Sequence, residues 1–260
     1  MPTIQWTSNT ITVAGTELHV QRGGTGTPIL LLHRDIGTLE SLPFYDALAQ
    51  RHDVIIPHHP GYGKSPRPEW VGSTRDIATL HRALLGQLGV KDATLVGLGF
   101  GGWIGAEMAT YAPYDTSKIV LLNPMGVKPP NGDILDQALI SYIEYVQAGF
   151  HDAAVFDRIF GARPSSEQLI AWDICREMSF RVAWRPYMYN DSLPHLLRGV
   201  QAKALILASE HDQVVPRSAA TLYAAQLPNA RLQIVANAGH LAELEQPAAL
   251  ADIITSFIAA

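Results

Sequence analysis

The chain has 260 residues, of which 47% are hydrophobic and 17% charged, with a formal net charge of −5 at pH 7. Lys and Arg form no cluster of the kind that nucleic acid requires, and no run approaches the roughly 18 apolar residues of a membrane span. The start lacks a basic and apolar leader, and the single cysteine, Cys175, excludes an internal disulfide. We therefore expect a cytoplasmic monomer or homodimer that binds neither nucleic acid nor membranes.

Short apolar runs alternate with helical patterns along most of the chain. The predicted strands cover residues 3–8, 17–22, 29–33, 53–57, 93–97, 118–122, 203–208 and 231–235. The predicted helices of this part cover residues 42–50, 74–88, 100–111, 216–226 and 247–258. This alternation predicts an α/β fold, with a mostly parallel eight-stranded sheet, helices on both faces and an antiparallel edge formed by the first strands.

Residues 124–201 interrupt the alternation, because no strand pattern appears there. Helical patterns cover residues 133–150 and 167–178, and an aromatic run follows at residues 180–189. We interpret 124–201 as an inserted helical cap on a core made of residues 1–123 and 202–260, since insertions of this size tend to cover a site. Trp184, Tyr187 and Tyr189 are candidates to line a pocket under the cap, although an aromatic stripe also suits core packing.

Five segments at predicted strand ends carry a resemblance to one family. They are PILLLHRDIG, PHHPGYGKSPRP, VGLGFGG, ALILASEHDQVVP and VANAGHLAELEQP. In this order and spacing they resemble the oxyanion loop, the glycine-rich loop, the nucleophile elbow, the acid strand and the histidine loop of the α/β-hydrolase family. The resemblance covers nearly the whole chain and implies that Asp212 orients His240 as a general base. All five segments fall where open α/β sheets bind their ligands.

Gly99 departs from the family pattern, because it stands where the elbow G-x-S-x-G carries its serine. Glycine has no side chain to act as a nucleophile, yet it tolerates the strained backbone of the elbow. A natural glycine and an engineered replacement of serine both remain open, although alanine would be the commoner engineering choice. Either way, the turn can persist without covalent chemistry.

The oxyanion loop departs as well, because the family's His-Gly-x is His33-Arg34-Asp35 here. The resemblance implies that the backbone N–H groups of Asp35 and Phe100 would stabilise a developing oxyanion. An ionised Asp35 carboxylate close to that anion would repel it. The carboxylate therefore either points away, serves as an acid or base opposite His240, or plays a structural role by pairing with Arg34 or capping the next helix.

Two functions of different classes fit these residues. The first is an enzyme in which His240, held by Asp212, activates water or the substrate itself, acting on a small, largely apolar ester, lactone or activated carbonyl, or in lyase or isomerase chemistry. The second is a protein that binds a small ligand without catalysis. Histidines near strand ends lack metal-ligand spacing, and no dinucleotide fingerprint opens a helix, so we expect neither a metal nor a cofactor.

Overall fold

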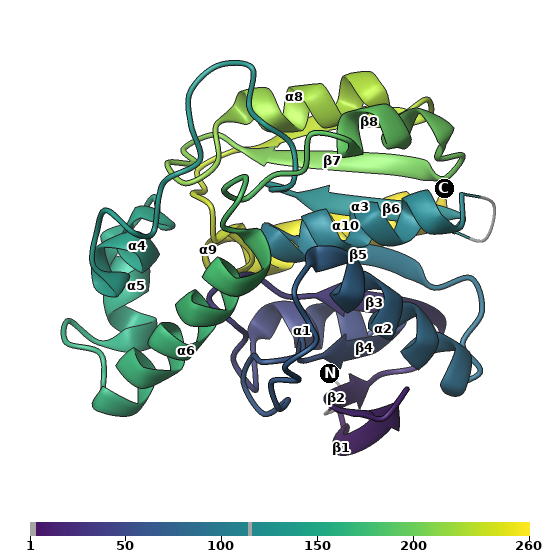
Figure 1. Cartoon of the computed structure of the whole chain (residues 1–260), viewed down its shortest axis with the longest axis horizontal. Coiled ribbons are helices and arrows are strands. Elements are labelled where there is room, and N and C mark those ends of the chain that lie inside the picture. Colours follow the sequence, from purple (N-terminus) through teal and green to yellow (C-terminus); the bar gives the residue numbers. More distant parts are fainter. Residues whose placement is uncertain (1–3, 114–115) are drawn as a thin grey trace.

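The computed structural model describes residues 4–113 and 116–260, so residue 3 of the first predicted strand lies outside the described residues. Eight strands of these residues form one sheet in the order β1-β2-β4-β3-β5-β6-β7-β8 (Figure 1). The strands are β1 (Trp6–Val13), β2 (Thr16–Gly23), β3 (Thr27–Leu32), β4 (His52–Pro57), β5 (Thr94–Leu98), β6 (Lys118–Leu122), β7 (Lys203–Ser209) and β8 (Ala230–Val235). Pairing is antiparallel from β1 to β2 and from β2 to β4, and parallel across the rest. The predicted mostly parallel sheet and its antiparallel edge are confirmed.

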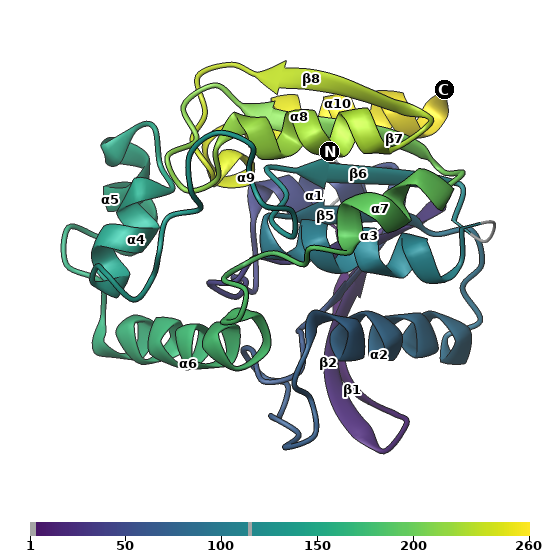
Figure 2. The same ribbon diagram turned by 45° about the horizontal axis from the view of Figure 1, so that its top comes forward.

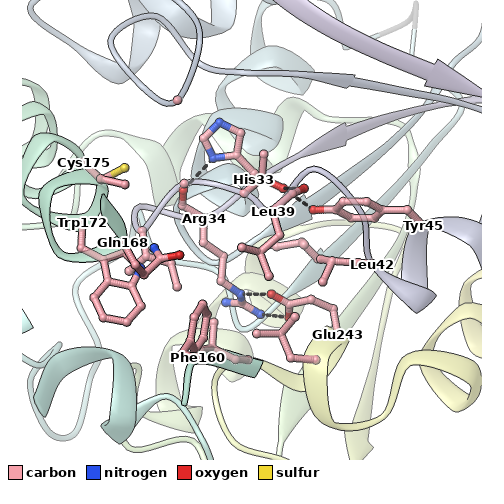
Figure 3. Close-up of a pocket in the computed structure, with 18 of the residues that line it drawn as sticks. His33, Arg34, Leu39, Leu42, Tyr45, Phe160, Gln168, Trp172, Cys175 and Glu243 are labelled. Carbon is pink, nitrogen blue, oxygen red and sulfur yellow. Dashed lines mark hydrogen bonds and ion pairs between the residues drawn. The ribbon is translucent and has the colours of Figure 1, made fainter. Parts of the chain in front are cut away.

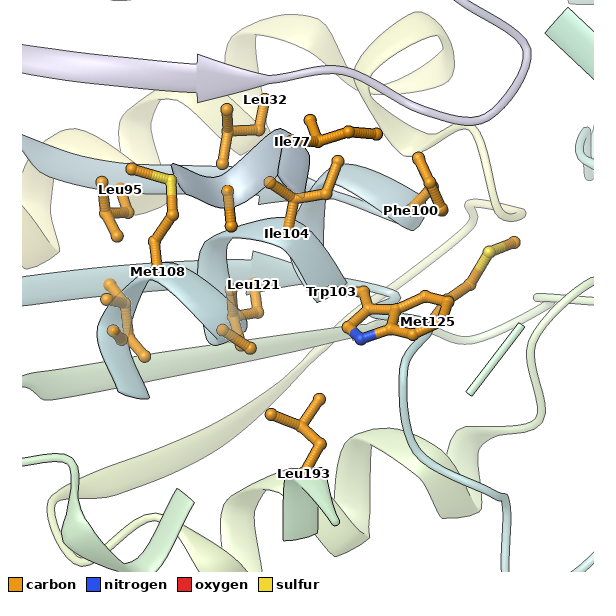
Figure 4. Packing of buried hydrophobic residues seen from close by; sticks show 14 of the residues in the cluster. Leu32, Ile77, Leu95, Phe100, Trp103, Ile104, Met108, Leu121, Met125 and Leu193 are labelled. Carbon is orange, nitrogen blue, oxygen red and sulfur yellow. The ribbon is translucent and has the colours of Figure 1, made fainter. Parts of the chain in front are cut away.

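Helices cover both faces of the sheet. On one face lie α1 (Pro43–Ala49) and α10 (Pro247–Ala259), which contact each other, and on the other lie α2 (Thr74–Gln87), α3 (Phe100–Tyr111) and α8 (Arg217–Gln226). Strand residues alternate between the two faces, so Ile29 and Leu31 belong to one apolar core and Leu30 and Leu32 to the other. In Figure 4, Leu32, Leu95 and Leu121 of the sheet pack against Ile104 and Met108 of α3.

Helix α3 lies close against the sheet because its first turn is built from glycines. A methyl group at Gly101 would come within 2.1 Å of the Leu32 carbonyl oxygen, and one at Gly97 within 2.5 Å of the Gly101 carbonyl oxygen. Both obstacles are backbone atoms, which have little freedom to move. The close approach of β5, α3 and β3 therefore requires glycine at these positions.

Residues 124–201, the predicted cap, contain helices that differ from those predicted. The expected helix over 133–150 is wrong, because only α4 (Tyr142–Ala148) forms there and Ser141 caps it through a capping box. A separate helix, α5 (Ala153–Phe160), begins after Asp152, whose side chain accepts the Ala154 N–H. These capping side chains satisfy backbone donors at the two helix starts, so the first helix begins at Tyr142 rather than near 133, and a second helix that was not predicted follows it.

Helix α6 (Ser166–Ala183) extends further than the pattern indicated and ties the cap to the core. Its Arg181 donates to the carbonyl oxygens of Val71 and Glu69, and its Ser179 shares a hydrogen bond of 3.0 Å with Tyr62. In Figure 2 the helices α4, α5 and α6 lie at the end of the molecule toward which the parallel strands point. The short α7 (Leu193–Leu196) and the following turn Leu197–Gly199 then return to α3 and α8.

Gly101→Ala should destabilise the protein strongly, because the added methyl group meets backbone rather than a movable side chain. We expect the free energy of unfolding, measured by urea denaturation, to fall by about 2–3 kcal/mol. The matched control is Gly86→Ala in α2, where an added methyl group meets nothing within 4 Å. That control should be neutral or stabilise by roughly 0.5–1 kcal/mol, and equal effects of the two substitutions would contradict the close packing described above.

Candidate active site

The elbow between β5 and α3 is preserved around Gly99. Gly99 has φ +52° and ψ −109°, a backbone conformation that side chains rarely adopt and glycine adopts freely. Its N–H donates to the Leu122 carbonyl oxygen, and its own carbonyl oxygen accepts the N–H groups of Gly102 and Met125. The elbow is therefore fixed by neighbouring backbone, although no side chain projects from its apex.

His240 and Asp212 lie together as the family resemblance implied. His240 Nδ1 is 2.8 Å from Asp212 Oδ2, and both side chains are less than 5% exposed. The other carboxylate oxygen of Asp212 accepts the N–H groups of Val214 and Val215, each at 2.8 Å. A carboxylate fixed in this way holds the imidazole with Nδ1 as the donor, which leaves Nε2 as a hydrogen-bond acceptor.

The space beside Gly99 is shared by two side chains. A Cβ atom built on Gly99 would lie 2.8 Å from Arg34 Nη1 and 2.9 Å from His240 Nε2. The guanidinium thus extends into the place where a nucleophile's side chain would begin, and the imidazole faces the same place. The absence of a side chain at Gly99 and the position of the Arg34 guanidinium are therefore one structural feature.

Arg34 is held there by a buried ion pair with Glu243. Its Nε and Nη2 donate to the two carboxylate oxygens of Glu243, each at 2.7 Å, and both residues are less than 5% exposed. Figure 3 shows the guanidinium lying across the floor of a cavity toward Glu243. Burial alone would lower the pKa of Arg34, but the carboxylates of Glu243, Asp212 and Asp35 outweigh it, so the pKa is raised and the charge is permanent.

Asp35 turns toward the cap. Its Oδ2 accepts from Gln137 Nε2 at 2.5 Å and from the Tyr145 hydroxyl at 2.7 Å. It takes no part in the Arg34 ion pair, and the next helix begins after Leu42, so Asp35 does not cap it. Its carboxylate therefore joins the oxyanion loop to α4 and the segment before it.

A stack of buried histidines fixes the loop that carries Arg34. The backbone N–H of His59 donates to His33 Nε2, so the His33 proton is on Nδ1 and is donated to the Arg34 carbonyl oxygen at 2.7 Å. His59 Nε2 donates to the His33 carbonyl oxygen, so its Nδ1 accepts from His81 Nε2. Burial holds the pKa of all three rings below the usual histidine value, to about 3 for His81. Each neutral ring thus has one defined tautomer.

Three buried polar atoms without a partner belong to residues that line one small cavity. They are Arg34 Nη1, Asp35 Oδ1 and His240 Nε2, and their residues all line a cavity of about 10 Å³. A cavity of this size holds roughly one water molecule. The three groups offer a donor and two acceptors, but the wall of the cavity itself is apolar, so a water would reach them only after the lining side chains shift.

A larger cavity of about 200 Å³ adjoins the small one, and Arg34, Ile36 and Leu241 line both. Its walls are mainly apolar and include Leu39, Leu42, Phe160, Trp172, Ile174 and Cys175 (Figure 3). The expectation that Trp184, Tyr187 and Tyr189 line the pocket is not met in these two cavities. The Tyr187 hydroxyl instead donates to the Leu135 carbonyl oxygen, and Trp184 packs on Phe180 at the surface.

Sequence reasoning missed Glu243, Gln137 and Tyr145. Glu243 lies three residues after His240, and an acidic residue at this spacing was a weak signal of a partner for Arg34. Gln137 and Tyr145 lie in the cap, where no sequence feature connects them with Asp35. Within residues 4–113 and 116–260, no group of three or more His, Cys, Asp and Glu side chains has the arrangement of a metal site.

Known proteins share this architecture. The family model described as "Alpha/beta hydrolase family" matches residues 29–253. The chain belongs to the alpha/beta hydrolase family. A curated relative, 2-hydroxymuconate semialdehyde hydrolase from Pseudomonas sp. (strain CF600), is 24% identical over 96% of this chain and 93% of its own.

Solved structures agree with this hydrolase fold. A bacterial membrane phospholipase A is 21% identical with a TM-score of 0.83 over 97% of this chain and 86% of its own. The 2-hydroxy-6-oxo-6-phenylhexa-2,4-dienoate hydrolase from Rhodococcus sp. strain RHA1 is 19% identical. Its TM-score is 0.79, over 99% of this chain and 100% of its own. At these identities the structures establish the fold alone. No helix of the described residues has the length and apolarity to cross a membrane.

The buried histidines should make this protein sensitive to acid. Burial lowers the pKa of His58 from 6.5 to about 4. Above pH 6.5 the His58 ring is neutral in both the folded and the unfolded protein. Between pH 6.5 and 4 it binds a proton in the unfolded chain but not yet in the folded protein. The free energy of unfolding should therefore fall in this window, by about 2–3 kcal/mol for His58. His58→Asn, which keeps an acceptor for the Lys64 N–H, should reduce that slope in urea titrations, whereas the exposed His195→Asn should not. Equal slopes would contradict the assignment.

A serine introduced at position 99 should not perform covalent chemistry, because Arg34 occupies the space that its side chain needs. We expect Gly99→Ser to remain unlabelled by a fluorophosphonate reagent, as measured by intact-protein mass spectrometry. Combining it with Arg34→Gly and Glu243→Gln vacates the space without leaving a buried charge, and this variant should be labelled at one site. Adding His240→Ala should abolish that labelling. Full labelling of Gly99→Ser alone would show that the guanidinium does not hold this space.

Proposed function

We propose that this protein is a hydrolase that attacks a small, largely apolar ester, lactone or activated carbonyl directly with water. The observation that carries the proposal is the unpaired His240 Nε2, which is buried, oriented by Asp212 and directed at the place of the missing nucleophile. General-base activation of water needs such an acceptor in a fixed position. No side chain at position 99 competes for it.

The attacking water would lie beside His240, at the small cavity, once a slight shift of the lining side chains exposes their polar atoms to it. It would accept a hydrogen bond from Arg34 Nη1 and donate to Asp35 Oδ1 and His240 Nε2, the three unpaired atoms of that cavity. Three partners of this kind hold a water in one orientation, with a lone pair free for attack. Asp35 would thus position the water, a role that differs from the acid or base opposite His240 suggested by the sequence.

The substrate would occupy the larger cavity, which meets the small one at Arg34. Nη1 carries two hydrogens, so it can bind the water with one and the substrate's carbonyl oxygen with the other. As His240 takes the water's proton, the oxygen bonds to the carbonyl carbon and negative charge moves to the carbonyl oxygen. Arg34 Nη1, together with the backbone N–H of Phe100, would stabilise that charge, and His240 would then return its proton to the leaving alkoxide.

Ligand binding without catalysis is the second candidate, and one observation favours it. Neither His240 nor Asp212 lines the larger cavity. A ligand confined to that cavity would contact Arg34 and Glu243 but not the imidazole. In this case the pair of His240 and Asp212 would serve only as hydrogen-bonded structure.

Hydrolysis of a panel of activated esters and small lactones tests the proposal. His240→Gln should lower kcat by about 10²–10⁴-fold, because it removes the general base while keeping a polar side chain. The exposed His195→Gln is the matched control and should retain the parental rate. A His240→Gln variant as active as the parent would refute the mechanism. A parent protein that binds esters but hydrolyses none would favour the ligand-binding function.

A further inference from the structure

We propose that the larger cavity selects uncharged carbonyl compounds and rejects carboxylates. The proposal deepens the function above and rests on that cavity being the substrate site. Arg34 is the sole cationic side chain among the described residues that line it, and Glu243 the sole anionic one. The charges of Arg34 and Glu243 therefore sum to zero in the lining of this cavity.

The positive charge of Arg34 is already paired with the carboxylate of Glu243. Two of its nitrogens donate to both oxygens of Glu243 at 2.7 Å, the paired geometry by which a guanidinium binds a carboxylate. A second carboxylate would compete with Glu243 for one cation. It would also lose its hydration without gaining a full counter-ion, which is costly in a buried site.

Further carboxylates lie beyond the ion pair. Asp35 lines the adjoining small cavity, where its partners are the neutral Gln137 and Tyr145. Asp212 stands behind His240, which it contacts at 2.8 Å. Three carboxylates therefore face one guanidinium around this site, so an entering anion meets net repulsion.

The neutral groups of the cavity match a carbonyl compound with an apolar body. Arg34 Nη1 has no partner and donates well to a carbonyl oxygen. Phe160, Trp172 and Leu39 offer apolar walls, and burial raises the pKa of the Cys175 thiol to about 12, so it adds no charge. An ester or lactone would therefore bind, and the acid released by hydrolysis would be expelled by the same charges.

A matched pair of ligands tests the selectivity without any turnover. The ketone 4-phenylbutan-2-one and the acid 3-phenylpropanoate share a ring and spacer and differ in a methyl group against a carboxylate oxygen. Isothermal titration calorimetry of the full-length protein at pH 7.5 should give a Kd at least about tenfold lower for the ketone. Equal or tighter binding of the acid would overturn the proposal, as would absence of binding by both.

A variant identifies the residue responsible. Glu243→Gln leaves Arg34 without its counter-ion, so the acid should gain at least about tenfold in affinity relative to the ketone. Glu40→Gln, which changes an exposed carboxylate six residues from Arg34, is the matched control and should leave the ratio unchanged. An unchanged ratio in Glu243→Gln overturns the assignment to the ion pair. If Glu243→Gln does not fold, the comparison of the ketone and the acid on the parent protein decides whether the cavity rejects carboxylates.

The two proposals can fail separately. Tighter binding of the acid, together with ester hydrolysis that depends on His240, would refute the selectivity and leave the hydrolase function standing. Preference for the ketone without hydrolysis of any ester would refute the hydrolase function and leave the selectivity standing.

Discussion

The ion pair between Arg34 and Glu243 determines what this active-site region can do. It places a permanent positive charge where a nucleophile's side chain would begin, and it requires glycine at position 99 to make room. A buried pair of this kind contributes little net stability, while leaving either partner alone is costly, so its two residues depend on each other. Gly99, Arg34 and Glu243 form one unit.

The surroundings keep this unit in place. His33 and Gly37 both donate to the Arg34 carbonyl oxygen, so the backbone is fixed at the point from which the guanidinium extends. Asp35, the next residue, is anchored to cap side chains on the other side of the loop. A guanidinium held in a fixed position can stabilise a developing negative charge effectively, because it has to reorganise little during the reaction.

The fold was largely predictable from the sequence, whereas the site was only partly so. Periodicity and turn residues act locally, so strands such as β3 and β5 and helices such as α3 could be located, and the approach of His240 to Asp212 followed from family motifs. The partner of Arg34 could not be located, since Glu243 reaches it across 209 residues of chain through tertiary packing alone. The helices of this segment were misjudged because Ser141 starts a helix inside the predicted pattern 133–150, and Asp152 starts a further helix beyond its end.

The attachment of α6 has a consequence for the kinetics of ligand exchange. Its C-terminal half is tied to the core through Ser179 and Arg181, whereas Ile174, which lines the larger cavity, is 49% exposed. Ligands would therefore pass beside Ile174 without the cap lifting as a body. Passage then depends on side-chain rotations, which are faster than the movement of a whole domain, so diffusion and ligand width set the rate of exchange.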